Sequence, residues 1–118
     1  MLLLTFLEFS RIAKSEFSDT VKEVEIYDDR LKLYLRRGSV LEVRYPTDKK
    51  YSFHLRMGDE IYRIDTAPPH PEIPSHPRHI HLKREDVIIE DTITSFNNTP
   101  AENFRRVMMW IKDMLQSH

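Results

Sequence analysis

The sequence predicts an α+β fold: an antiparallel β-meander of about five to six strands, with an N-terminal and a C-terminal helix packed on one face. Two observations support this prediction. Apolar residues recur with helical spacing at both ends of the chain, and with a period of two between Val21 and Thr66. Turn-type residues divide that central region at short intervals, as in strands joined by hairpins. With 118 residues, the chain has the length of a single domain, residues 1–118.

The first element, from Leu2 to about Lys14, is predicted to be an amphipathic helix. Its apolar residues form a broad stripe with helical spacing: Leu2, Leu3, Phe6, Leu7, Phe9, Ile12 and Ala13. Glu8 and Arg11 interrupt the apolar run, so it does not have the form of a signal peptide. No other segment is apolar enough to span a bilayer, and we expect a soluble, cytoplasmic protein with no membrane partner.

Five strands are predicted between Val21 and Thr66. Because side chains alternate along a strand, they can be sorted onto the two faces of the sheet. The apolar face, which both helices should cover, comprises Leu31, Leu33, Leu35, Leu41, Val43, Tyr45, Tyr51, Phe53, Leu55, Tyr62 and Ile64. The opposite face carries five cations and two carboxylates among Lys32, Tyr34, Arg36, Glu42, Arg44, Ser52, His54, Arg56, Arg63 and Asp65.

This opposite face is locally basic, although the net charge of −1 excludes a globally basic nucleic-acid binder. One interpretation is RNA binding, in which arginines contact phosphates and Tyr34 stacks on a base. The arginines are Arg36, Arg44, Arg56 and, from the following segment, Arg78. The alternative is a charged surface that contacts only solvent, which is common on exposed strands.

The segment from Ala67 to Glu85 is predicted to be mostly extended loop. It holds five of the chain's seven prolines and four of its six histidines. Proline donates no backbone hydrogen bond and keeps the preceding residue out of the helical region. The apolar run from Val87 to Ile89 could add a short strand after this loop.

The last element is predicted to be a helix that begins at Pro100 and ends at about Gln116. Thr99 can cap it, and Glu102 can return the second hydrogen bond of a capping box. One face must be buried, because the apolar residues follow helical spacing at Phe104, Val107, Met108, Ile111 and Leu115. The methionines either complete the core or form a contact in a homodimer; they are Met108, Met109 and Met114.

The histidines of the loop suggest acid–base chemistry. If the chain is extended around residue 80, His79 and His81 project to the same side. Such a pair titrates near neutral pH and could cleave RNA without a metal while an arginine holds the phosphate. The candidate catalytic residues of this ribonuclease hypothesis are His79, His81, Asp65, Arg63 and His54.

Metal binding is the second hypothesis. Neutral imidazoles of His76, His79 and His81, with His70 or Asp65 as further candidates, would suit a divalent ion such as zinc. The chain has no cysteine, which excludes disulfides, thiolate ligands and a cysteine nucleophile. A third hypothesis is a non-catalytic protein-binding module, in which these histidines only cap backbone groups of a proline-stiffened loop.

Four short blocks follow one another along the chain: Ser39 to Val43, Tyr51 to His54, Arg63 to Pro68 and His76 to His81. In this order they resemble the TumE family of toxin–antitoxin toxins, with its patterns G-S-x-L, Y-S-Y-H, R-x-D-N-A-P-H-H and F-P-x-H-x-H. His79 and His81 match directly. Thr66 stands where the family usually has asparagine, and Pro69-His70 replaces its paired histidines.

The resemblance implies a small growth-inhibiting protein encoded beside an antitoxin, usually a helix-turn-helix DNA-binding protein that neutralises it. The resemblance does not supply the chemistry of the toxin. RNA as a target, and ribonuclease activity, are hypotheses that rest on the basic face and on the histidines beside it.

Overall fold

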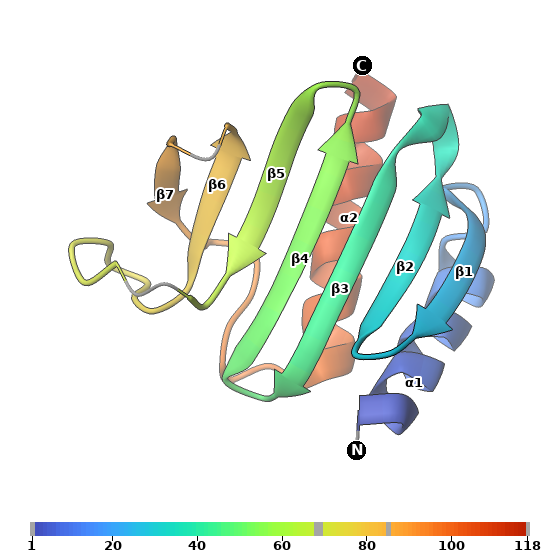
Figure 1. The fold of residues 1–118 in the computed structure, drawn as a ribbon, viewed down its shortest axis with the longest axis horizontal. Helices are drawn as coiled ribbons and strands as arrows, with labels where there is room; N and C mark the ends of the chain where they lie inside the picture. The colour runs from blue at the N-terminus through green and yellow to red at the C-terminus, as the bar shows by residue number, and fades with distance from the viewer. Residues whose placement is uncertain (1, 68–69, 85, 118) are drawn as a thin grey trace.

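The computed structural model describes residues 2–67, 70–84 and 86–117. It is one antiparallel sheet with two helices on the same side (Figure 1). The elements in chain order are α1 (Leu2–Glu16), β1 (Val21–Tyr27), β2 (Arg30–Leu35), the 3-10 turn η1 (Arg36–Gly38), β3 (Val40–Thr47), β4 (Lys50–Met57), β5 (Glu60–Asp65), β6 (His79–Lys83), β7 (Ile88–Glu90) and α2 (Pro100–Ser117). The strands lie in the sheet in their chain order, which confirms the predicted α+β meander.

The sheet has seven strands within the described residues, where about five to six were predicted. The additional strand is β6, which lies in the segment predicted to be mostly loop. In β6, Ile80 and Leu82 alternate with His79 and His81, and Ile80 is buried in the core. The last proline of the segment is Pro77, so β6 keeps all the backbone N–H groups that strand pairing needs. The short strand predicted after the loop is β7.

Helix α1 buries a narrower stripe than predicted. Its buried apolar residues are Phe6, Phe9, Ile12 and Ala13. The ring of Phe9 stacks on that of Phe104 in α2, with 4.5 Å between the ring centroids. Leu3 and Leu7, predicted to lie on the buried side, are 60% and 50% exposed. The sequence stripe was too broad because α1 packs against the sheet and α2 along only one side.

Helix α2 begins with the predicted capping box. The Thr99 N–H donates to Glu102 Oε1 at 3.0 Å, and the Glu102 N–H donates to Thr99 Oγ1 at 3.2 Å. The predicted apolar face is buried at all five positions, Phe104, Val107, Met108, Ile111 and Leu115. Met108 therefore belongs to the core, whereas Met109 is 50% exposed.

The two faces of the sheet differ in what covers them. Figure 1 shows α1 and α2 behind the sheet, and all eleven side chains predicted for the apolar face are buried. In the described part of the chain, no helix covers the other face, so polar side chains of β2 to β5 reach its surface. Neither helix among these residues has the length and apolar character needed to cross a membrane.

Candidate functional site on the uncovered face of the sheet

Strand register brings the predicted catalytic residues together on the uncovered face. Glu42 in β3 pairs with His54 in β4, His54 pairs with Arg63 in β5, and Arg63 pairs with His81 in β6. Paired residues of an antiparallel sheet have their side chains on the same face. The four side chains therefore form one row across four strands.

A second row lies beside the first. Ser52 in β4 pairs with Asp65 in β5, and Asp65 pairs with His79 in β6. The candidate catalytic residues are thus on three adjacent strands and one face; they are His54, Arg63, Asp65, His79 and His81. Alternation predicted this face for the first three, and for His79 and His81 only that they project to the same side.

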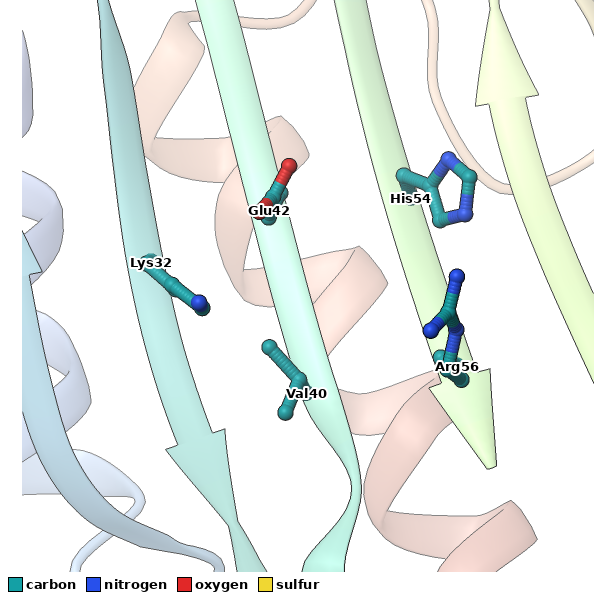
Figure 2. A pocket seen from close by; sticks show the side chains of 5 residues that line it. All are labelled: Lys32, Val40, Glu42, His54 and Arg56. Atoms are coloured by element: carbon teal, nitrogen blue, oxygen red, sulfur yellow. The ribbon is translucent and has the colours of Figure 1, made fainter. Parts of the chain in front are cut away.

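A shallow depression lies over β2, β3 and β4 on this face. Its volume is about 240 Å³, and Figure 2 shows the side chains that line it. Lys32 comes from β2, Glu42 from β3, and His54 and Arg56 from β4. His54 is half-buried at the border of the depression, so its imidazole is accessible from solvent.

Two further depressions continue this one across the sheet. The second, of about 220 Å³, shares Glu42 and His54 with the first and adds Arg44, Ser52, Arg63 and Asp65. The third, of about 440 Å³, shares Arg44, Ser52 and Asp65 with the second and extends past the β3–β4 turn. We call the three together the central groove. Six cations and two carboxylates line it: Lys32, Arg44, Lys49, Lys50, Arg56, Arg63, Glu42 and Asp65.

Arg63 connects the central groove with β6. Its Nε lies 3.4 Å from Asp65 Oδ2, and its Nη2 donates to His81 Nε2 at 3.1 Å. Asp65 is held in turn, because its Oδ1 accepts the N–H of Ala67 at 3.0 Å. The guanidinium group is therefore fixed at two points while it lines the groove.

Three imidazoles, which we call the histidine cluster, pack beside Arg63: His70, His79 and His81. The ring centroids of His70 and His79 are 4.4 Å apart, and those of His79 and His81 are 4.9 Å apart. One ring nitrogen of each histidine lies within 4.8 Å of one on each of the others. His79 is 0% and His81 4% exposed, because the loop that carries His70 folds over this end of the sheet.

Hydrogen bonds orient the rings of the cluster. His79 Nδ1–H donates to the Pro77 carbonyl at 3.0 Å, and His70 Nδ1–H donates to Glu72 Oε1 at 3.2 Å. Desolvation by burial is the main cause that lowers the pKa of His79, and the two neighbouring imidazoles lower it further. Burial therefore favours the neutral form of the His79 imidazole.

His76, the third histidine of the predicted ligand set, is exposed and lies outside the histidine cluster. The geometry groups His70 with His79 and His81 instead. His70 was only one of the further candidates in the sequence. Its selection depends on how the loop folds back, for which the sequence carries no local signal.

The residues predicted to bind RNA divide into two groups. Arg44 and Arg56 line the central groove, and Tyr34 lies in β2, with Lys32 Nζ 5.2 Å from its ring centroid. Arg36 lies in η1 rather than in a strand, and its Nη1 donates to the Asp19 carbonyl at 3.1 Å.

Arg78 is occupied by structural contacts. Its side chain is only 17% exposed, and its Nη1 lies 3.3 Å from Asp91 Oδ2. The same nitrogen donates to the carbonyls of Asp91 and Thr94, and the guanidinium lies over the ring of Phe96. Arg78 thus ties the start of β6 to the segment before α2 and does not line the groove.

Lys32, Lys49 and Lys50 were not among the predicted site residues but line the groove. Strand alternation already put Lys32 on the correct face. Lys49 and Lys50 follow Pro46-Thr47-Asp48 at the predicted turn, so their position at the end of the groove is a consequence of the β3–β4 hairpin.

Fold and site together define a small α+β protein whose open antiparallel face carries a basic groove beside a buried histidine cluster. The family model described as "Toxin TumE" matches residues 3–115. The chain therefore belongs to the TumE toxin family, and membership of a toxin family implies a cognate antitoxin. No match is found among the curated proteins or the solved structures.

Proposed function

We propose that this protein is the toxin of a toxin–antitoxin pair and that it inhibits growth by binding and cleaving RNA in the central groove. The observation that carries the proposal is the charge of the groove: six cations and two carboxylates line it, in a protein of net charge −1. A phosphate backbone is the polyanion that such a surface attracts. Tyr34, near the groove in β2, adds an aromatic ring on which an unpaired base can stack.

Cleavage would take place beside His54, the imidazole that lines two of the three depressions. In the proposed step, His54 takes the proton of an RNA 2′-hydroxyl, and that oxygen forms a bond to the adjacent phosphorus. The bond from phosphorus to the 5′-oxygen breaks, and this oxygen takes a proton from solvent. Arg63 lies in the neighbouring strand and would stabilise the charge on the phosphate.

The acid–base roles of His79 and His81 stay a prediction. A general base has to reach the proton it removes, and exposures of 0% and 4% favour His54 over these two residues. His81 would act on the site through Arg63, whose guanidinium it helps to hold.

The proposed partner is an antitoxin of the helix-turn-helix DNA-binding class, and the proposed location is the cytoplasm. Both rest on the resemblance to the family. A homodimer also stays a prediction, and Met109, half-exposed on α2, is the methionine that would contribute to it.

Induced expression in a bacterial host tests the proposal, with RNA cleavage by the purified protein as a second readout. The variants are His54→Ala and His76→Ala, the latter an exposed histidine outside the groove. Equal abundance and equal circular dichroism are required. We expect arrest and RNA cleavage from the unaltered protein and from His76→Ala, and neither from His54→Ala.

Two results would contradict the proposal. If the purified protein does not bind single-stranded RNA, RNA is not the target. If His54→Ala cleaves RNA as fast as the unaltered protein, the catalytic role of this imidazole is wrong.

A further inference from the structure

Two buried ring nitrogens of the histidine cluster have no hydrogen-bond partner in the described part of the chain. They are Nε2 of His70 and Nε2 of His79. Leaving one buried polar atom unpaired costs roughly 1–3 kcal/mol, so each such atom needs an explanation. Both nitrogens belong to the same cluster, and one shared ligand would satisfy both.

The proton positions follow from the partners of the other ring nitrogens. Nδ1 of His70 faces a carboxylate and Nδ1 of His79 faces a carbonyl, and both partners only accept hydrogen bonds. Each Nδ1 therefore carries the proton, and each Nε2 carries a lone pair. His81 has its lone pair on Nε2 too, because Arg63 can only donate to it.

We propose that His70, His79 and His81 bind one divalent transition-metal ion, with zinc as the best fit. Neutral imidazole is a preferred zinc ligand, and three histidines with one position for water are a known coordination set. A carboxylate or carbonyl on the far nitrogen is the usual support for a ligating histidine. Glu72 gives this support to His70, and the Pro77 carbonyl gives it to His79.

The cluster needs only a small contraction to reach metal-binding geometry. Its nitrogens lie within 4.8 Å of one another. Zinc–nitrogen bonds of ~2.0–2.1 Å in a tetrahedral site require nitrogens about 3.4 Å apart. His79 and His81 are fixed by β6, whereas His70 is on a loop, so rotation of the His70 side chain supplies most of the movement.

Metal binding would also displace Arg63 from His81, since the ion and the guanidinium would compete for the same lone pair on His81 Nε2. The ion pair with Asp65 keeps the guanidinium in place and offsets its charge beside the ion. Burial favours the neutral form of His79, as ligation requires, because it lowers the pKa of this imidazole. The inference goes beyond the proposed function, because binding of the ion does not depend on RNA.

Metal content and affinity of the tag-free full chain test the inference. The protein is loaded with zinc, dialysed, and analysed for bound metal. Affinity is measured by competition with a chromophoric chelator, and the unfolding temperature is measured with zinc and with EDTA. His70→Ala removes a loop ligand without altering β6, and His76→Ala is the matched control from the same loop.

We expect one equivalent of zinc on the unaltered chain and on His76→Ala, with a higher unfolding temperature for both. His70→Ala should bind roughly 100-fold more weakly, since loss of an outer-shell partner alone costs ~10–100-fold. Cobalt(II) should give the intense visible bands of a tetrahedral site in the unaltered chain and not in His70→Ala. Absence of stoichiometric zinc, or equal affinity of His70→Ala and the unaltered chain, would overturn the inference.

Discussion

Arg63 is a side chain that lines the central groove and also contacts the histidine cluster. Its Nε and Nη2 engage Asp65 and His81 at the same time, in the rigid planar fork of the guanidinium, a geometry that a lysine ammonium does not reproduce. Orientation, rather than charge alone, is therefore what the two neighbours provide. A substitution that keeps the positive charge but not the guanidinium separates the contribution of orientation from that of charge.

Arg63→Lys should retain the fold and the proposed RNA binding but lose most of the proposed cleavage activity. We expect a decrease of ~10²-fold, the effect typical of removing one fixed donor from a developing oxyanion. The measurement is the rate of RNA cleavage by purified protein, with Arg106→Lys, an exposed arginine of α2, as control. Equal rates for Arg63→Lys and the unaltered protein would refute the role of the guanidinium.

Asn103 is a fully buried amide whose donors and acceptor are paired. Its Nδ2 donates to the Tyr45 hydroxyl and to the Ser95 carbonyl, both at 3.0 Å. Its Oδ1 accepts the Ser95 N–H at 3.0 Å and Asn98 Nδ2 at 3.1 Å. The residue thus connects α2, β3 and the segment before α2.

Asn103→Ala should lower the free energy of unfolding by roughly 2–3 kcal/mol, because the buried partners of the amide lose their hydrogen bonds. Chemical denaturation measures the change. Asn97→Ala, at an exposed position of the same segment, should stay within about 0.5 kcal/mol of the unaltered protein. A similar loss in both variants would mean that the Asn103 network is not the cause.

Burial also raises the pKa of Tyr45 and Tyr51, whose rings stack at 4.7 Å between centroids. The folded state holds these phenolic protons more tightly than the unfolded state, where the tyrosine pKa is about 10. Their contribution to stability is complete below that pH and is lost as the pH rises above it. We expect the free energy of unfolding to fall above pH ~10, and Tyr51→Phe to reduce the slope. Chemical denaturation at a series of pH values measures this slope, and Tyr27→Phe, at an exposed position, is the control. Equal slopes in Tyr51→Phe and Tyr27→Phe would contradict the prediction.

Among the helices and strands, those with regularly spaced apolar residues or a defined capping motif were predictable from the sequence. Helix α2 begins at its predicted capping box, and all eleven side chains that alternation assigned to the inward face of β2 to β5 are buried. Strand β6 was expected as loop, because histidine and proline dominate its surroundings. The stripe of α1 was assigned too broadly, since Leu3 and Leu7 are apolar but remain 60% and 50% exposed.

Thr99→Ala tests the capping box of α2. The threonine hydroxyl satisfies the Glu102 N–H, and its loss should lower stability by about 1 kcal/mol. For a domain of this size, that corresponds to a decrease of roughly 4 °C in the unfolding temperature. Thermal unfolding followed by circular dichroism measures it, with the exposed Thr92→Ala as control. No difference between the two variants would show that the box adds nothing to stability.

At the scale of the whole molecule, the charge is unevenly distributed rather than large. The chain has a net charge of −1, yet the cations of β2, β4 and β5 face the same groove. The sequence predicted which side chains lie on this face, because side chains alternate between the two faces along each strand of a meander. It did not predict that His70 packs over His79 and His81, since the path of a loop depends on long-range contacts such as that of Arg78 with Asp91.

The proposed RNA binding in the central groove should weaken steeply with salt. For single strands, the logarithm of the binding constant changes with the logarithm of salt concentration by about −0.7 for each neutralised phosphate. The double variant Arg44→Ala, Arg56→Ala should therefore reduce the slope by about 1.4. Fluorescence anisotropy with a short single-stranded RNA measures it, and Arg106→Ala on the helical side is the control. An unchanged slope in the double variant would exclude the groove as the phosphate contact.

The meander has a consequence for how this protein reaches its folded state. Each strand pairs with the strand that precedes it in the chain, from β1 to β7, so the pairings of the sheet are local. Low contact order favours rapid folding. During synthesis, the hairpins from β1 to β5 can close as soon as their second strand leaves the ribosome, whereas α2 has to return to α1 at the start of the chain. For the toxin proposed above, rapid folding would leave little time between translation and activity, so the implied antitoxin would have to be present beforehand.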